Sequence, residues 1–151
     1  MILMILATAS IFSQILAYTQ VTKHIVEVMV GLPLGPVALM IIMHLVLLVM
    51  GMFISATAIL MLIIPLFMPI TLAVGFDPIW FCVTVALNME MALSTPPFGI
   101  LLFVVKGVAL PGTTMGDIYR AALPFLLCDL VVLVLLILYP GLVLWLPGVM
   151  K

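Results

Sequence analysis

The stretch Ser94-Thr95-Pro96-Pro97-Phe98-Gly99 interrupts an apolar run over residues 79–105 that is otherwise long enough to cross a bilayer. Two consecutive prolines lack backbone N–H groups, so the carbonyls of Ala92 and Leu93 lose their helical hydrogen-bond donors. The residue before each proline is also disfavoured in the α conformation. An unsatisfied carbonyl is costly in hydrocarbon, and a broken backbone therefore persists there only beside protein, water or an ion. We predict that the chain is organised around this break.

The composition is that of an integral membrane protein. Of 151 residues, 68% are hydrophobic and 6% are charged, whereas a soluble domain carries roughly 25% charged residues. The net charge of −1 offers no basic surface for a nucleic acid. Cys82 and Cys128 lie in apolar runs without the spacing of a metal site, and we expect both to be buried, unpaired thiols.

Hydropathy predicts an all-α polytopic membrane protein with a single membrane domain over 1–151. We expect a transmembrane helix over 1–18, a broken transmembrane helix over 79–106 and a final transmembrane helix over 118–146. Tyr119 lies near one end of the last helix, as in an aromatic belt. Residues 21–32 are too short and too polar to span, which favours a helix lying in the membrane interface. The chain enters its first apolar helix at once, which suggests a fragment.

Residues 35–74 have two interpretations. Two arms of about 15 residues flank the segment Gly51-Met52-Phe53-Ile54-Ser55-Ala56-Thr57, and each arm is short for a full crossing at 1.5 Å per residue. The arms form either two thin transmembrane helices or a re-entrant hairpin whose tip, residues 51–57, stops inside the bilayer. The absence of charge in this turn favours the hairpin, because a turn outside the membrane normally collects charged residues.

Three ionisable residues lie within predicted membrane segments, where such residues mark function by default. Glu90 stands one helical turn before the proline break and is either a polar ligand beside the freed backbone or a carboxyl that packs between helices. For His44 we expect a hydrogen-bonded core histidine. For Asp129 we expect contact with a neighbouring helix or partner subunit.

The break offers oxygen atoms to a ligand. Ser94, Thr95 and Gly99 flank the double proline, and the hydroxyls together with the freed carbonyls are hard oxygen ligands. Discontinuous helices of this kind bind sodium and anionic substrates near the midplane of secondary transporters. The motifs of metalloproteases, α/β-hydrolases and P-loop NTPases are absent from the sequence. We therefore predict a transporter without an organic cofactor, and not an enzyme.

A series of motifs, in order and spacing, resembles the large membrane subunit (DctM-like) of TRAP transporters, the tripartite ATP-independent periplasmic carriers. The resemblance extends over essentially the whole chain. The motifs are residues 51–57, Pro65, Pro69, Gly75-Phe76-Asp77-Pro78, residues 79–81, Asn88-Met89-Glu90, residues 95–99, residues 103–109, Pro124-Phe125 and Leu144-Trp145-Leu146-Pro147.

The resemblance implies a fold and a function. The family's large subunit has two inverted repeats, each with a re-entrant hairpin and a broken helix, and this chain resembles only the second, so the first repeat is expected to be missing. The family imports organic anions such as C4-dicarboxylates by sodium symport across the cell inner membrane, through a multi-pass protein. Its partners are a small membrane subunit (DctQ-like) and a periplasmic solute-binding protein (DctP-like), besides the first repeat and the lipid bilayer.

The resemblance implies that residues 51–57 and 95–99 together form one sodium site and half of the substrate cleft. With the residues around the break, the candidates for binding sodium or substrate are Gly51, Met52, Ser55, Thr57, Asn88, Glu90, Ala92, Leu93, Ser94, Thr95, Pro96, Pro97 and Gly99. Ser55 replaces a commonly acidic residue, and His44 replaces a frequent asparagine. The alternative is a truncated fragment without transport of its own, which acts at most as a scaffold or assembly partner. The sequence does not name the anion.

Overall fold

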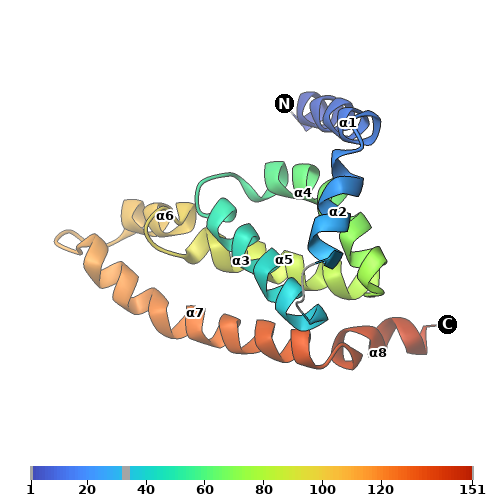
Figure 1. Ribbon diagram of the computed structural model, residues 1–151. Helices are drawn as coiled ribbons and strands as arrows, with labels where there is room; N and C mark the ends of the chain where they lie inside the picture. Colours follow the sequence, from blue (N-terminus) through green and yellow to red (C-terminus); the bar gives the residue numbers. More distant parts are fainter. Residues whose placement is uncertain (1, 32–34, 151) are drawn as a thin grey trace.

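The computed structural model of the protein describes residues 2–31 and 35–150 (Figure 1). Within these ranges the chain is helical and contains no β-strand. Residue 1 of the predicted first span and residue 32 of the predicted interfacial helix lie outside the described residues. The described helices are α1 (Ile2–Tyr18), α2 (Val21–Gly31), α3 (Pro36–Gly51), α4 (Ala56–Val74), α5 (Pro78–Ser94), α6 (Ile100–Val108), α7 (Met115–Leu138) and α8 (Gly141–Val149).

Helix α5 lies at the centre of the molecule (Figure 1). It packs against α3, α4, α6, α7 and α8, while α1 and α2 pack on α4. The buried residues of α3 recur at helical spacing, which places them on the face toward α5. The core is formed by apolar side chains from four helices: Leu39, Met40, Met43, Leu47, Ile59, Ile63, Phe67, Ile70, Trp80, Phe81, Val85, Met89, Met91, Leu133 and Ile137.

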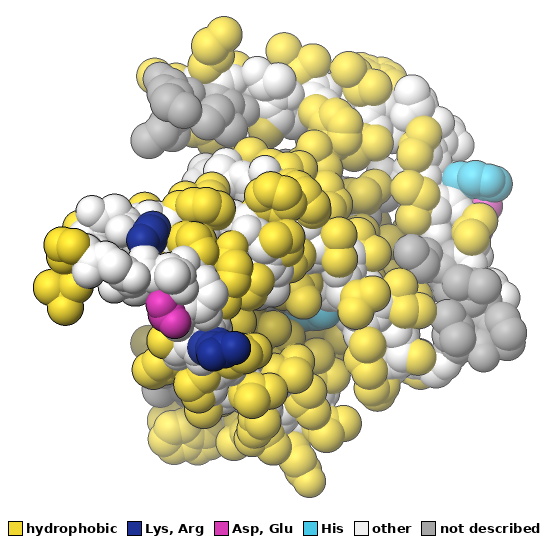
Figure 2. Space-filling view, turned by 90° about the vertical axis from the view of Figure 1, so that its left-hand side faces the viewer, with side chains coloured by type: hydrophobic (Ala, Val, Ile, Leu, Met, Phe, Trp, Pro, Cys, Tyr) yellow, Lys and Arg dark blue, Asp and Glu magenta, His cyan; other side chains and the backbone are white. Residues whose placement is uncertain are grey.

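The outer surface is hydrophobic as well (Figure 2). Helices α4 and α7 are long and apolar enough to cross a membrane, and most of the apolar side chains of α7 point outward. A soluble protein does not expose apolar surface on this scale. The fold therefore agrees with the prediction of a helical membrane protein.

Local signals in the sequence set several helix ends. Gly75 closes α4 with a left-handed φ of 84°, and the amide of Phe76 donates to the Thr71 carbonyl at 2.9 Å. Asp77 caps α5 by accepting from the amides of Ile79 at 2.8 Å and Trp80 at 3.3 Å. These local signals produce the turn at residues 75–78.

Two sequence predictions differ from the structure. The predicted helix over 118–146 is divided, because Pro140 lacks an amide donor and disfavours helix at Tyr139, where α7 has ended. The prediction that Cys82 and Cys128 are buried is wrong, since both are free thiols on the outer surface.

Candidate functional site

Two non-helical links lie side by side in the structure. The hairpin link, residues 52–55, joins α3 to α4, and the proline link, residues 95–99, joins α5 to α6. The rings of Phe53 and Phe98 connect them, with centroids 5.0 Å apart and planes tilted by 40°. Segments more than forty residues apart in the sequence thus meet at one place.

The helix ends that precede the links are in close contact. Gly51 ends α3 and is buried, and an added Cβ at this position would lie 2.5 Å from the Cβ of Ala92. Ala92 is itself fully buried near the end of α5. Since two carbon atoms in contact normally lie about 3.5–4.0 Å apart, only glycine fits here. The glycine brings the hairpin link against the proline link.

Hydrogen bonds order the beginning of the proline link. The Ala92 carbonyl loses its α-helical donor at Pro96, as predicted, but it accepts a hydrogen bond from the amide of Thr95 at 3.2 Å. The Thr95 hydroxyl donates to the Met91 carbonyl at 2.6 Å, and the Ser94 hydroxyl donates to the Glu90 carbonyl at 3.5 Å. Because each hydroxyl proton is directed to the helix, the lone pairs of both oxygens remain available to a ligand.

Backbone oxygens crowd around Gly99. Its ideal Cβ would lie 2.7 Å from the Leu93 oxygen and 2.9 Å from the Thr95 oxygen. The Gly99 amide donates to the Thr95 carbonyl at 3.0 Å. A side chain would fill this space, so glycine permits two carbonyls to approach the same point. Carbonyl and hydroxyl oxygens together form the donor set that a hard cation prefers.

Helix ends of both polarities meet at the two links. Helices α3 and α5 end there, and α4 and α6 begin there. A helix C-terminus carries partial negative charge and a helix N-terminus carries partial positive charge. The junction therefore presents electrostatic features for a cation and for an anion without a basic side chain among the candidate residues.

Asn88 does not reach the links. Its side chain is buried between α5 and α3, where the amide nitrogen donates to the His44 carbonyl at 2.9 Å. The imidazole of His44 is also buried, and its Nδ1 lies 3.0 Å from the Met40 carbonyl oxygen, which makes Nδ1 the donor. His44 is a hydrogen-bonded core histidine, as predicted. His44 Nε2 and Asn88 Oδ1 have no partner within the described residues.

The other candidates differ in position and in exposure. Two lie at the hairpin link or the helix end before it, Gly51 and Met52. Seven lie at the proline link or the helix end before it: Ala92, Leu93, Ser94, Thr95, Pro96, Pro97 and Gly99. Glu90 is exposed, on the side of α5 away from buried Asn88. Ser55 precedes α4 without capping it through its side chain, and Ser55 and Thr57 are both exposed. The structure brings the proline link together with Gly51 but leaves Asn88 and Glu90 apart.

The sequence analysis missed Tyr119 at this site. Its hydroxyl, on α7, donates to the Pro97 carbonyl at 3.1 Å, although the two residues stand 22 positions apart. The sequence predicted Tyr119 for an aromatic belt only because the residue lies near one end of the last helix. No local pattern in the sequence indicates a contact across the intervening helix and loop.

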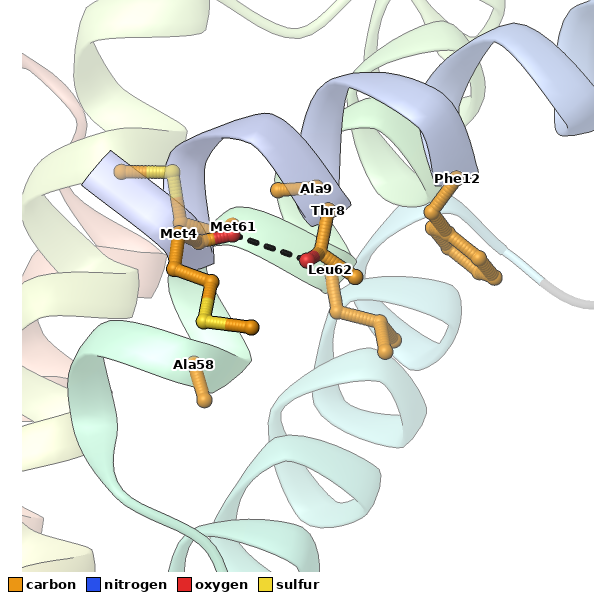
Figure 3. Close-up of a pocket in the computed structure, with 7 residues that line it drawn as sticks. All are labelled: Met4, Thr8, Ala9, Phe12, Ala58, Met61 and Leu62. Carbon is orange, nitrogen blue, oxygen red and sulfur yellow. Dashed lines mark hydrogen bonds between the residues drawn. The ribbon is translucent and has the colours of Figure 1, made fainter. Parts of the chain in front are cut away.

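An apolar groove of about 470 Å³ lies elsewhere, between α1 and α4 (Figure 3). Its polar side chain, Thr8, donates to the Met4 carbonyl at 2.8 Å. The other side chains that line the groove are apolar. It is lined by Met4, Thr8, Ala9, Phe12, Ala58, Met61 and Leu62. Within the described residues, no group of three or more His, Cys, Asp or Glu side chains could hold a metal ion.

Comparison with known proteins identifies the family. Residues 1–142 match the DctM component of the tripartite ATP-independent periplasmic transporters. The chain belongs to the DctM family. This confirms the predicted resemblance, and because DctM proteins are components of transporters, it also agrees with the prediction that the chain is not an enzyme.

Individual relatives agree with this assignment. The chain is 35% identical over 147 residues to the C4-dicarboxylate TRAP transporter large permease protein DctM of Vibrio cholerae, covering 97% of the chain and 32% of that relative. It is 36% identical over 148 residues to the protein of the same name from Pseudomonas aeruginosa, covering 98% and 34%. It is 31% identical over 147 residues to the sialic acid TRAP transporter permease protein SiaT of Haemophilus influenzae, covering 97% and 24%. The chain thus spans about a third, or less, of the length of these relatives.

Proposed function

We propose that the chain is part of a sodium-coupled TRAP-type transporter that imports an organic anion, such as a C4-dicarboxylate or a related carboxylic acid. The observation that carries this proposal is the meeting of the hairpin link and the proline link, through the Gly51–Ala92 contact and the Phe53–Phe98 ring pair. Membership of the DctM family supports the same function. The protein works in the inner membrane as a multi-pass permease.

The architecture proposed for the membrane follows the predicted repeat. Helices α3 and α4 form the re-entrant hairpin, although its second arm, α4, has 19 residues where the sequence predicted about 15. Helices α5 and α6 form the proline-broken helix of the second inverted repeat. Helix α3 has 16 residues and α6 has 9, which at 1.5 Å per residue is shorter than the roughly 30 Å hydrocarbon core. Helices of these lengths end inside the bilayer, where their free backbone groups need partners.

The oxygen atoms at the proline link hold sodium in this proposal. The carbonyls of Leu93 and Thr95 and the hydroxyls of Ser94 and Thr95 supply its ligands, as the crowding at Gly99 supports. The helix N-termini at Ala56 and Ile100 attract the carboxylate of the substrate. Because the candidate residues include no basic side chain, bound sodium also supplies charge that balances the anion. Each ion therefore strengthens the binding of the other.

The partners are proposed from the family. A small membrane subunit and a periplasmic solute-binding protein complete the transporter, together with the first repeat of the large subunit. The alternative, a membrane fragment that acts only as a scaffold or assembly partner, differs in one measurable respect. Without the first repeat, this chain gives no sodium-dependent uptake under either hypothesis. In the complete assembly, uptake requires this chain only if it is a component of the transporter.

Substrate uptake into proteoliposomes tests the proposed sodium site. The complete permease containing this sequence is reconstituted with its partners, and uptake is measured against external sodium. We expect Thr95→Ala to raise the half-saturating sodium concentration several-fold, because a ligand oxygen is lost. Thr19→Ala is the matched control, since the Thr19 hydroxyl makes the same bond to a helix carbonyl, that of Ile15, and Thr19 follows α1, outside both links. An unchanged sodium dependence in Thr95→Ala and Ser94→Ala removes both hydroxyls from the site.

A further inference from the structure

The hydroxyl of Tyr119 connects α7 to the proline link. It donates to the Pro97 carbonyl at 3.1 Å. This carbonyl lies between α5 and α6, outside both helices. A backbone oxygen in such a position is costly to leave unpaired in hydrocarbon, so the tyrosine removes a penalty that the break creates.

Helix α7 holds Tyr119 in a fixed place. Its N-terminus is closed by a capping box, in which the Asp117 amide donates to the Thr114 hydroxyl oxygen at 3.3 Å and the Thr114 amide donates to the Asp117 carboxylate at 2.9 Å. Toward its other end, the indole Nε1 of Trp80 donates to the Leu136 carbonyl at 2.6 Å. The capping box orders the first turn of α7, and the Trp80 bond ties the helix to α5 near its other end. The position of the Tyr119 side chain therefore follows from the position of the helix.

The proline link is held from two directions. Phe98 packs against Phe53 of the hairpin link, and the adjacent Pro97 accepts the Tyr119 hydrogen bond. Gly99, the residue after Phe98, is the point on which the Leu93 and Thr95 carbonyls converge. A rotation of the Pro97 peptide changes the direction of the backbone that enters Gly99. The Tyr119 bond therefore acts on the geometry of oxygens that it does not touch.

We propose that Tyr119 is a positioning residue for the cation site: its hydrogen bond to Pro97 holds the proline link in the conformation that brings the Leu93 and Thr95 carbonyls together. This inference rests on the proposed function, because it gives those oxygens the role of sodium ligands. Tyr119 itself contacts neither ion nor substrate. It connects α7, which the sodium proposal does not otherwise use, to the affinity of the site.

The test compares Tyr119→Phe with Tyr139→Phe in the complete permease with its partners. Tyr139 follows α7, is exposed, and its hydroxyl makes no hydrogen bond within the described part of the chain. Each substitution removes one hydroxyl and preserves the ring, so both variants are expected to fold. Two quantities are measured: the hydrogen-exchange rate of the backbone amides at residues 98–102, and the sodium concentration that gives half-maximal uptake.

We expect Tyr119→Phe to speed exchange at residues 98–102 and to raise the half-saturating sodium concentration about two- to tenfold, the range of one lost hydrogen bond. Tyr139→Phe should change neither quantity. Unchanged exchange in Tyr119→Phe overturns the positioning role. Faster exchange with unchanged sodium dependence overturns its link to the cation site. If the wild-type permease takes up substrate independently of sodium, the proposed function fails, and the exchange rates alone then decide whether Tyr119 orders the link.

Discussion

Gly51→Ala tests the close contact between the two helix ends. The added methyl would lie 2.5 Å from the Cβ of Ala92, whereas carbon atoms in contact lie about 3.5–4.0 Å apart. Helices α3 and α5 must therefore separate locally by roughly 1 Å. Both positions are buried, and the obstructing atom is a Cβ that cannot rotate away, so the strain falls on the backbone.

The sign of the effect depends on two opposing contributions. Overpacking of a tight interface costs about 1–3 kcal/mol. Replacing glycine by alanine in a helix contributes at most about 1 kcal/mol of stabilisation. The net change at Gly51 is a destabilisation of roughly 1 kcal/mol. Gly107→Ala is the matched control, because Gly107 lies in α6 and an added Cβ there meets no atom within 4 Å.

Thermal unfolding of the purified complete permease in detergent measures the difference. We expect Gly51→Ala to unfold at a lower temperature than wild type and Gly107→Ala at the same or a higher temperature. Ala92→Gly removes the opposing methyl, so Gly51→Ala should lower the midpoint less in the Ala92→Gly background than in wild type, which a double-mutant cycle measures. Equal midpoints for the two alanine variants, or the same loss from Gly51→Ala in both backgrounds, would refute the contact argument.

Two further predictions concern the packing of α5. Asn88→Ala removes the donor to the His44 carbonyl inside the core and should destabilise the protein by about 1–3 kcal/mol. Glu90→Ala, on the exposed side of the same helix, is the control and should shift the unfolding midpoint little. Similar shifts for both variants would contradict the role of the Asn88–His44 hydrogen bond. Asp77→Ala should cost about 0.5–2 kcal/mol because two amides of α5 lose their cap, whereas Asp77→Asn keeps an acceptor and should recover most of this in the same unfolding measurement.

The helix boundaries at residues 75–78 and 94–100 could be predicted because their causes are local. Gly75 adopts the left-handed conformation, Asp77 supplies a cap, and Pro96 and Pro97 cannot continue a helix. The link between α3 and α4 was predicted from its glycine and from its lack of charge. These signals operate within a few residues of where they act.

Other features could not be predicted, for a physical reason. In a membrane protein both the core and the outer surface are apolar, so hydropathy does not separate buried positions from outward ones, and Cys82 and Cys128 were assigned to the wrong class. The Ala92 carbonyl accepts from the Thr95 amide in a local turn. The sequence indicated only that its α-helical bond is lost. The Tyr119 bond depends on the direction in which α7 returns past the proline link.

The Trp80 bond has a consequence for motion. The start of α5 is tied to the end of α7 through the indole and the Leu136 carbonyl, while the end of α5 is locked against Gly51 of α3. Tilting α5 alone would break one of these two contacts. A rearrangement at the proline link must therefore either stay within residues 95–99 or move α3, α5 and α7 together as one rigid body. Distances between α5 and α7 would stay constant through a transport cycle, and the changing distances would be those to α6.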